Sequence, residues 1–147
     1  MDPQYTQNFL AAVSASAAKD TKDPQAILHG VYAAIVQGDF EAASRSMTED
    51  VELNICGFGP MNGSWRGRKD VVEATRKNFA LVDAQQPEVD GMVSQGDSVA
   101  VLMRESGVLK STGEAYSVRG VQWFTFADGK IKAIDEILAS SERAKEA

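Results

Sequence analysis

The sequence predicts a single α+β domain, with helices in the first half of the chain and an antiparallel sheet in the second half. Apolar residues recur at helical spacing in several stretches up to about residue 82. Beyond it, stretches of alternating apolar and polar residues are separated by the turn signals QGD, KSTGE and ADGK. Helices gathered in one part of a chain and hairpin-connected strands in another are typical of an α+β fold. The length of 147 residues suits one domain with a single core.

The two ends of the chain are predicted to lie outside this domain. Residues 4–18 hold apolar side chains at helical spacing, and the polar stretch Lys19–Lys22 separates them from the rest of the chain. We expect residues 1–22 to form an N-terminal helix or arm, residues 23–139 to form the domain, and residues 140–147 to form a charged tail.

Two helices are expected at the start of the domain. Asp23 and Pro24 predict the first helix, because a capping carboxylate followed by proline at the first helical position is a strong start signal. Its apolar stripe is formed by Ile27, Leu28, Val31, Tyr32 and Ile35. Gly38 ends this helix, and Asp39 caps a short second helix that is expected to run through Met47.

A strand, a loop and a third helix are expected next. Val51–Cys56 alternates apolar and polar residues, which predicts a strand. The glycine-rich stretch Phe58–Arg68 predicts an elaborate loop, and the third helix is expected over about Lys69–Val82. The remaining strands are expected near residues 87–95, 98–109, 115–126 and 131–138.

Turn residues predict how the last three strands pair. Residues 111–113 and residues 127–129 each suit a three-residue hairpin loop with glycine in the left-handed position. In that register Arg104 faces Gly120, and Gly120 faces Glu136, so that the three residues form one row across the sheet.

The same register assigns the other polar residues to faces of the sheet. Gln122 falls on the face of Glu136, whereas Glu105 faces Arg119 on the opposite face, where we expect a structural or interface pair. A two-residue loop in the last hairpin would instead place Gln122 opposite Asp135. Because both faces mix apolar and polar side chains, we expect one under the helices and the other in a subunit interface.

Composition and charge argue against several classes of protein. The formal net charge is −6 at pH 7 and the basic residues are scattered, which argues against a nucleic-acid partner. No apolar run approaches the roughly 20 residues of a membrane span, so we expect no membrane partner and a cytoplasmic location. The chain has one histidine and one cysteine and lacks phosphate-binding or dinucleotide-binding glycine motifs, so we expect no metal and no cofactor.

Four stretches carry a resemblance to a known family: AIVQGDFEAASRSMTEDVEL, GSWRGRKDVV, TGEAY and WFTFADGKIKAIDEI. They resemble the SnoaL-like branch of the nuclear-transport-factor-2-like superfamily, to which ketosteroid isomerase and limonene epoxide hydrolase also belong. The similarity covers roughly residues 25–138. It implies a cone-shaped, curved antiparallel sheet wrapped around about three helices, a cystatin-like α+β barrel with a pocket at its wide end. It implies a fold more than a reaction, because one fold hosts many activities.

The resemblance also implies candidate site residues, position by position. The general-base aspartate of ketosteroid isomerase, at the end of the first strand, matches Asn54, and an amide cannot accept a proton at neutral pH. The oxyanion-hole aspartate matches Gln122, which can still donate a hydrogen bond through its amide. The oxyanion-hole tyrosine matches Val31, with Tyr32 beside it.

We therefore expect Glu136, Gln122 and Arg104 to be the catalytic residues. Glu136 would act as acid or base, Arg104 would tune its pKa, and Gln122 would hold a substrate oxygen. Arg104 with Glu136, or Arg119 with Glu105 and Asp135, imitates the composition of the aspartate–arginine–aspartate set of the epoxide hydrolase, although the motif has no match by position. A structural ion pair between Arg104 and Glu136 is an equal alternative.

Substrate-binding residues are expected around the same pocket. They are Asn54, Tyr32, Trp65 and Phe124. Core packing is the alternative for each aromatic residue, and ending a strand is the alternative for the asparagine. The resemblance places the loop Phe58–Arg68 beside the pocket mouth, where Trp65 either covers the pocket or packs on the third helix.

Three functions remain open from the sequence. The first is a cofactor-independent isomerase, cyclase, lyase or hydrolase that acts on a small apolar metabolite. The second is a carrier or sensor that binds a small molecule and releases it unchanged. The third is a dimerisation module whose pocket is filled by side chains. We expect a homodimer, with the N-terminal arm contacting the partner subunit if the third function holds.

Overall fold

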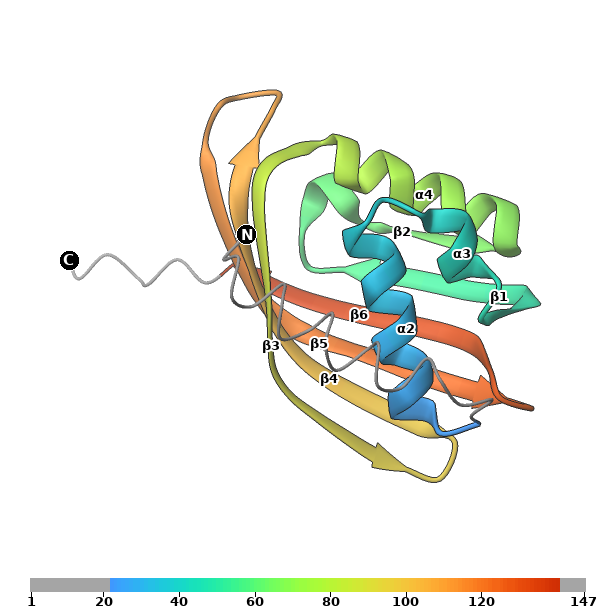
Figure 1. Cartoon of the computed structure of the whole chain (residues 1–147). Coiled ribbons are helices and arrows are strands. Elements are labelled where there is room, and N and C mark those ends of the chain that lie inside the picture. The colour runs from blue at the N-terminus through green and yellow to red at the C-terminus, as the bar shows by residue number, and fades with distance from the viewer. Residues whose placement is uncertain (1–21, 141–147) are drawn as a thin grey trace.

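A single curved sheet forms the frame of the fold in the computed structural model, which describes residues 22–140. Its six strands lie in the order β2-β1-β6-β5-β4-β3, and the sheet bends around the helices without closing into a barrel (Figure 1). The strands are β1 (Met47–Cys56), β2 (Gly63–Arg66), β3 (Val82–Gln95), β4 (Ser98–Leu109), β5 (Ala115–Ala127) and β6 (Lys130–Ser140). Neighbours are antiparallel except β1 and β6, which are parallel. The predicted α+β class and curved sheet are confirmed.

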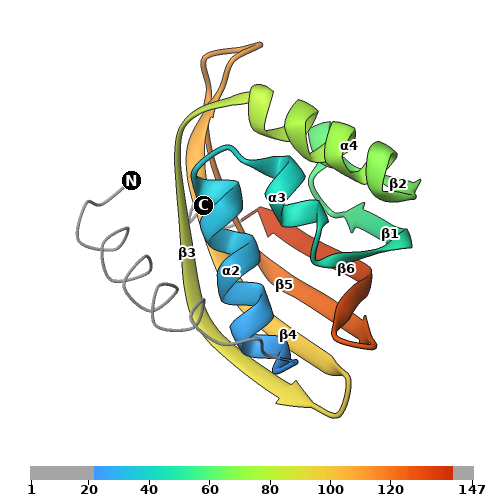
Figure 2. The ribbon, with the colours of Figure 1, turned by 45° about the vertical axis from the view of Figure 1, so that its right-hand side comes forward.

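The described residues contain three α-helices on the inner side of the bend. They are α2 (Pro24–Val36), α3 (Phe40–Ser44) and α4 (Arg68–Ala80). Helix α2 crosses the hollow of the sheet, whereas α4 lies beside β1 and β2 at the other end (Figure 2). The loop predicted between the first strand and the third helix also contains a short 3-10 helix, η1 (Gly59–Met61), and strand β2, which the sequence did not predict.

Capping residues set the helix boundaries much as predicted. The Asp23 carboxylate accepts a hydrogen bond from the backbone N–H of Ala26 at 3.3 Å, and Asp39 accepts one from Ala42 at 2.9 Å. Gly38 separates the two helices in the left-handed region, with φ of 77°. The second helix is shorter than predicted, because strand β1 already begins three residues after Ser44.

The hairpin between β5 and β6 differs from the prediction in its turn. Ala127 pairs with Lys130, so the turn consists of Asp128 and Gly129 alone, and the predicted three-residue loop is wrong. Both turn residues have positive φ, 50° and 76°, as a type I′ turn requires. The register then shifts by one residue, because Lys132 forms a β-bulge in β6.

This bulge determines which residues face one another further along the hairpin. Beyond it, Gln122 pairs with Glu136, and the alternative pairing of Gln122 with Asp135 does not occur. The predicted pairing of Gly120 with Glu136 is also wrong, since Gly120 pairs with Leu138. Gln122 and Glu136 therefore share one face of the sheet, as predicted, and lie directly opposite each other.

The hairpin between β4 and β5 is one residue out of the predicted register. A backbone hydrogen bond of 2.9 Å from Leu109 to Glu114 closes it, which leaves a longer loop than predicted. Arg104 consequently pairs with Arg119, and Glu105 no longer faces Arg119. Because neighbouring residues of a strand point to opposite faces, the slip places Glu105 on the inner face and Arg104 on the outer face.

The core fills the bend between sheet and helices. The largest fully buried side chains are Leu28, Val51, Val71, Val99, Val101, Val118 and Ile131. They come from α2, α4 and four strands, so their burial holds both ends of the sheet to the helices. No helix among the described residues has the length and apolar character needed to cross a membrane. The predicted N-terminal arm and charged tail lie outside the described residues except at their inner ends.

Close backbone packing at the end of β1 yields a stability prediction. Gly57 has φ of 94°, and a Cβ there would lie 1.7 Å from the carbonyl oxygen of Leu138. Gly113 also has positive φ, 73°, but a Cβ there would meet nothing within 4 Å. Gly57→Ala should therefore cost at least about 2 kcal/mol more in unfolding free energy than Gly113→Ala, as measured by urea denaturation. Equal costs for the two variants would contradict this packing.

Candidate functional site

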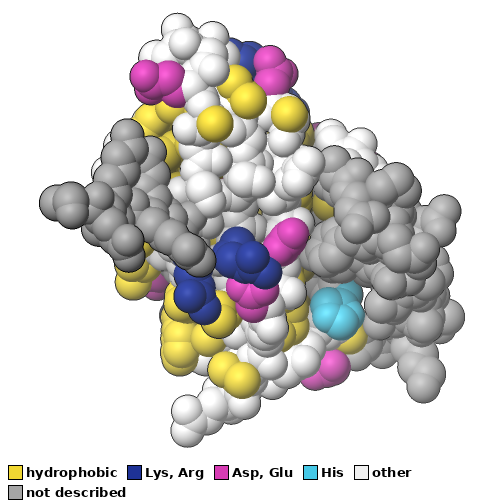
Figure 3. All heavy atoms as spheres, turned by 90° about the vertical axis from the view of Figure 1, so that its left-hand side faces the viewer, with side chains coloured by type: hydrophobic (Ala, Val, Ile, Leu, Met, Phe, Trp, Pro, Cys, Tyr) yellow, Lys and Arg dark blue, Asp and Glu magenta, His cyan; other side chains and the backbone are white. Residues whose placement is uncertain are grey.

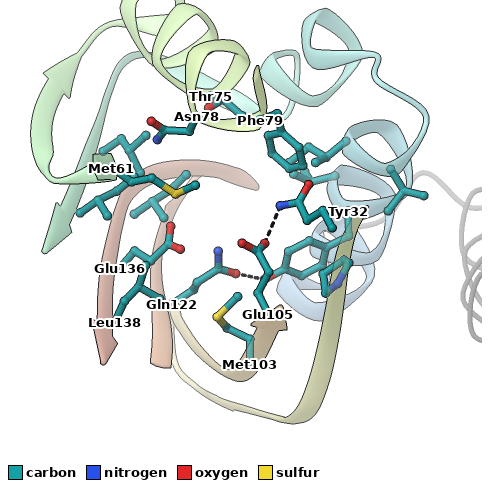
Figure 4. Close-up of a pocket in the computed structure, with 18 of the residues that line it drawn as sticks. Tyr32, Met61, Thr75, Asn78, Phe79, Met103, Glu105, Gln122, Glu136 and Leu138 are labelled. Carbon is teal, nitrogen blue, oxygen red and sulfur yellow. Dashed lines mark hydrogen bonds between the residues drawn. The ribbon is translucent and has the colours of Figure 1, made fainter. Parts of the chain in front are cut away.

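A cavity of about 370 Å³ lies in the bend of the sheet (Figure 4). Helices α2 and α4 bound it together with strands β1, β3, β4, β5 and β6. Most of its lining is apolar, as the side chains of Ile55, Phe79, Met103, Val118 and Leu138 illustrate. A hollow of this volume with few polar groups is characteristic of a small-molecule site.

The polar groups of the cavity come from six different elements. They are Tyr32 of α2, Thr75 and Asn78 of α4, Gln85 and Glu88 of β3, Glu105 of β4, Gln122 of β5 and Glu136 of β6. Each strand contributes through the face that carries its buried residues, so the sheet register determines which polar side chains enter the cavity.

Gln122 occupies the middle of this group and connects two neighbours. The Tyr32 hydroxyl donates a hydrogen bond to Gln122 Oε1 (Figure 4). The Gln122 amide group in turn donates to the carboxylate of Glu136. Tyr32 also packs edge-on against the ring of Phe124, with centroids 6.2 Å apart. These contacts fix the Gln122 amide with its nitrogen toward Glu136.

Glu136 lies in surroundings that favour its neutral form. It pairs with Ile55 of β1, and Ile134 and Leu138 precede and follow it on the cavity side of β6. Burial raises the pKa of its carboxyl group from 4.5 to about 7, and the charge of Glu105 adds to the rise, while the hydrogen bond from Gln122 opposes it. A carboxyl group with a pKa near neutrality can accept and return protons at physiological pH.

A second carboxyl group, that of Glu105, faces the same cavity and is held in a different way. Gln85 Nε2 donates to its Oε1 at 2.5 Å, and the Tyr116 hydroxyl donates to its Oε2 at 2.8 Å. The pKa of Glu105 is raised overall, because burial has a larger effect than these two hydrogen bonds, which lower it. Burial and the neighbouring carboxylate also raise the pKa of Tyr116, which keeps its hydroxyl protonated and able to donate. Because both oxygens of Glu105 accept hydrogen bonds, its partners favour the anion.

Arg104 does not belong to this site. Its guanidinium lies on the outer face of the sheet, where it is 2.8 Å from Asp90 and 2.8 Å from Glu88. The predicted pairing of Arg104 with Glu136 is wrong, because the one-residue slip between β4 and β5 turns Arg104 away from the cavity. Figure 3 views the molecule from the left-hand side of Figure 1 and shows basic and acidic side chains side by side near the centre of that surface.

The predicted substrate-binding residues divide into two pairs. Tyr32 and Phe124 line the cavity, as expected. Asn54 does not, since it lies on the outer face of β1 and its amide donates to Asp135 at 3.0 Å. Trp65 does not line the cavity either, because it lies in β2 and packs against the hydrophobic core.

Five polar residues of the cavity were missed from the sequence: Thr75, Asn78, Gln85, Glu88 and Glu105. Asn78 lies on the inner side of α4, and Gln85 lies within a register shift of β3 between Asp83 and Gln86, where Ala84 has φ of 51°. No local sequence signal predicts this register shift. Glu105 was predictable, because it follows the buried residues Val99, Val101 and Met103 at the next inward position of β4.

Known proteins share both the sequence pattern and the fold. The profile of the SnoaL-like domain family matches residues 28–134. The crystal structure of an NTF2-like protein from Burkholderia xenovorans is 25% identical, covers 76% of this chain and 86% of its own, and superposes with a TM-score of 0.68. A second NTF2-like protein, from Burkholderia thailandensis, is 24% identical over 76% of this chain and 87% of its own, with a TM-score of 0.69.

A third solved structure shares this fold. TerC, co-crystallised with polyporic acid, is 21% identical over 76% of this chain and 87% of its own, with a TM-score of 0.65. No curated protein sequence matches the chain at a significant level.

The raised pKa of Glu136 predicts how stability changes with pH. Between 4.5 and about 7 the folded protein retains a proton that the unfolded chain releases, so ionisation of Glu136 destabilises the fold as the pH rises through this window. Glu136→Gln should therefore be more stable than the native protein above neutral pH, by up to about 3 kcal/mol, and the gain should disappear toward acidic pH.

Chemical denaturation across this pH range measures the difference. Asp135→Asn is the matched control, because it removes the adjacent carboxyl group on the outer face of β6. A Glu136→Gln protein that gains no stability above neutral pH would contradict the raised pKa.

Proposed function

The chain belongs to the family of SnoaL-like domains, and from this premise we propose that it is a cofactor-independent enzyme acting on a small apolar metabolite by proton transfer. Isomerisation, cyclisation, elimination and hydrolysis all include such a step. The observation that carries the proposal is the carboxyl group of Glu136, whose pKa is raised to about 7 and which faces an apolar cavity. A group of that kind is costly to the fold and useful to general acid–base catalysis.

The roles of the site residues follow from their contacts. Glu136, as carboxylate, removes a proton from the bound molecule, and as carboxylic acid it returns one at another atom. Gln122 donates one amide N–H to Glu136 and has a second N–H for a substrate oxygen. Tyr32 holds Gln122 in this orientation through its hydroxyl group. The apolar lining excludes water and positions the substrate.

Ligand binding in this cavity has separate support. The volume of about 370 Å³ suits a molecule of one or two small rings. TerC, which shares the fold, was co-crystallised with a small organic molecule. A protein that binds such a molecule without transferring a proton would be a carrier, and an elimination assay separates the two functions.

Proton removal by Glu136 can be measured without knowing the natural substrate. Nitrobenzisoxazole is a small, neutral, apolar probe: a base removes its C–H proton, the C–H electrons form a nitrile, and the N–O bond breaks to release a coloured phenolate. The native protein should accelerate this elimination, with a rate that rises with pH through about 7 as Glu136 ionises. Glu136→Gln should lose about 100-fold or more of the rate, because an amide is not a base.

Asp135→Asn is again the matched control and should retain the native rate, since Asp135 lies on the outer face beside Asn54. A Glu136→Gln protein as fast as the native one would refute the role of Glu136. Binding of the probe without acceleration would favour the carrier function.

The outer face of the sheet supports a second part of the proposal, the homodimer. Trp123 is 43% exposed there and Ile137 is 61% exposed. Leu102, Val121 and Ile137 pair across β4, β5 and β6, so these side chains form one apolar row on the face away from the cavity. A self-complementary apolar face of this kind fits a two-fold interface between copies of the chain.

Replacing Trp123 by glutamate tests this interface. The substitution places a charge beside the apolar row and should convert a dimer into a monomer, as measured by sedimentation equilibrium. Lys132→Glu, on the exposed edge of the bulge, changes charge outside the row and should leave the dimer intact. A native protein that sediments as a monomer would contradict the proposed dimer.

A further inference from the structure

The cavity contains carboxyl groups and, within residues 22–140, no cationic side chain. Glu105 and Glu136 face it, and the third acidic residue of its wall, Glu88, is 2.8 Å from Arg104 on the outside. No lysine, arginine or histidine among the described residues lines the cavity. Because the lining is mostly apolar, a charge inside the cavity acts on a ligand with little screening.

Glu105 has hydrogen-bonding capacity left on the cavity side. Its two oxygens accept one hydrogen bond each, from Gln85 and Tyr116. A carboxylate offers about four lone-pair sites, so about two remain for a ligand. The two donors also hold the carboxylate in one orientation. An acceptor-only anion in apolar surroundings is best satisfied by a positively charged N–H donor.

Aromatic side chains beside the carboxylates favour the same kind of ligand. Tyr32, Phe79 and Phe124 all line the cavity, and the first and last of these pack edge to face. The faces of aromatic rings attract cations, whereas they offer nothing to a carboxylate. The carboxyl groups and the aromatic rings of the cavity therefore both favour a cationic ligand.

We propose that the ligand of this pocket is a small apolar amine, bound as its ammonium form, with Glu105 as the residue that anchors the cation. The proposal rests on the proposed function in one respect, that the cavity is the ligand site. The ammonium group donates to the free lone pairs of Glu105, and the apolar part of the molecule fills the remaining space toward α4. Anionic ligands are disfavoured by the same two carboxyl groups.

Three probes of the same size and different charge test the proposal. Benzylamine is a cation at neutral pH, benzyl alcohol is neutral, and benzoate is an anion. Calorimetric titration of the full chain at low ionic strength should show benzylamine binding at least about tenfold more tightly than benzyl alcohol. Benzoate should bind more weakly than either.

The variant Glu105→Gln tests whether Glu105 causes the preference for benzylamine. It keeps the shape of the side chain and an acceptor oxygen but removes the charge, so the preference for benzylamine over benzyl alcohol should fall to within about twofold. Asp135→Asn removes the same charge from the outer face of the sheet and should keep the native preference.

Either of two results would overturn the proposal. One is a native protein that binds benzylamine no more tightly than benzyl alcohol, including the case in which neither binds. The other is a Glu105→Gln protein that keeps the full preference. Failure here is distinguishable from failure of the proposed function, because elimination of the neutral probe nitrobenzisoxazole depends on Glu136 and not on the charge of the ligand.

Discussion

The pairing of β5 with β6 is the constraint on which the site depends. A two-residue turn at Asp128 and Gly129, followed by a bulge at Lys132, brings Gln122 directly opposite Glu136 on the inner face of the sheet. If Lys132 paired in regular register instead of forming the bulge, the partner of Gln122 would be Asp135, and Glu136 would point to the outer face. One extra residue in one strand therefore decides which carboxyl group is buried in the cavity.

The two carboxyl groups that face the cavity, those of Glu136 and Glu105, lie in different surroundings. Glu136 has apolar neighbours and a single amide donor, so that burial dominates and its neutral form is favoured. Glu105 accepts hydrogen bonds on both oxygens, from Gln85 and Tyr116, and these bonds oppose the effect of burial. Burial still outweighs these bonds, so the pKa of Glu105 is raised as well. The charge of Glu105 also acts on Glu136 and adds to the rise in its pKa.

Local chemistry predicted the elements of the fold better than their register. The helix starts at Asp23 and Asp39 and the strand positions follow from caps, periodicity and turn residues, which act over a few positions. Register depends on loop length, and an error of one residue after Leu109 exchanged the faces of β4. For that reason Arg104 was assigned to the cavity and Glu105 to the outside. The sequence does contain the opposite indication, because apolar residues at every second position of β4 end at Met103, and Glu105 is the next residue on that face.

The ionisation of Glu136 is the property that links the fold to the proposed chemistry, and it can be observed directly. NMR titration of the carboxyl carbons in isotope-labelled glutamate follows each group separately. One carboxyl group should titrate at about 7, and its signal should be absent from the Glu136→Gln protein. If every glutamate of the native protein titrated near 4.5 or below, Glu136 would be an ordinary solvated carboxylate and the proposed proton transfer would lose its basis.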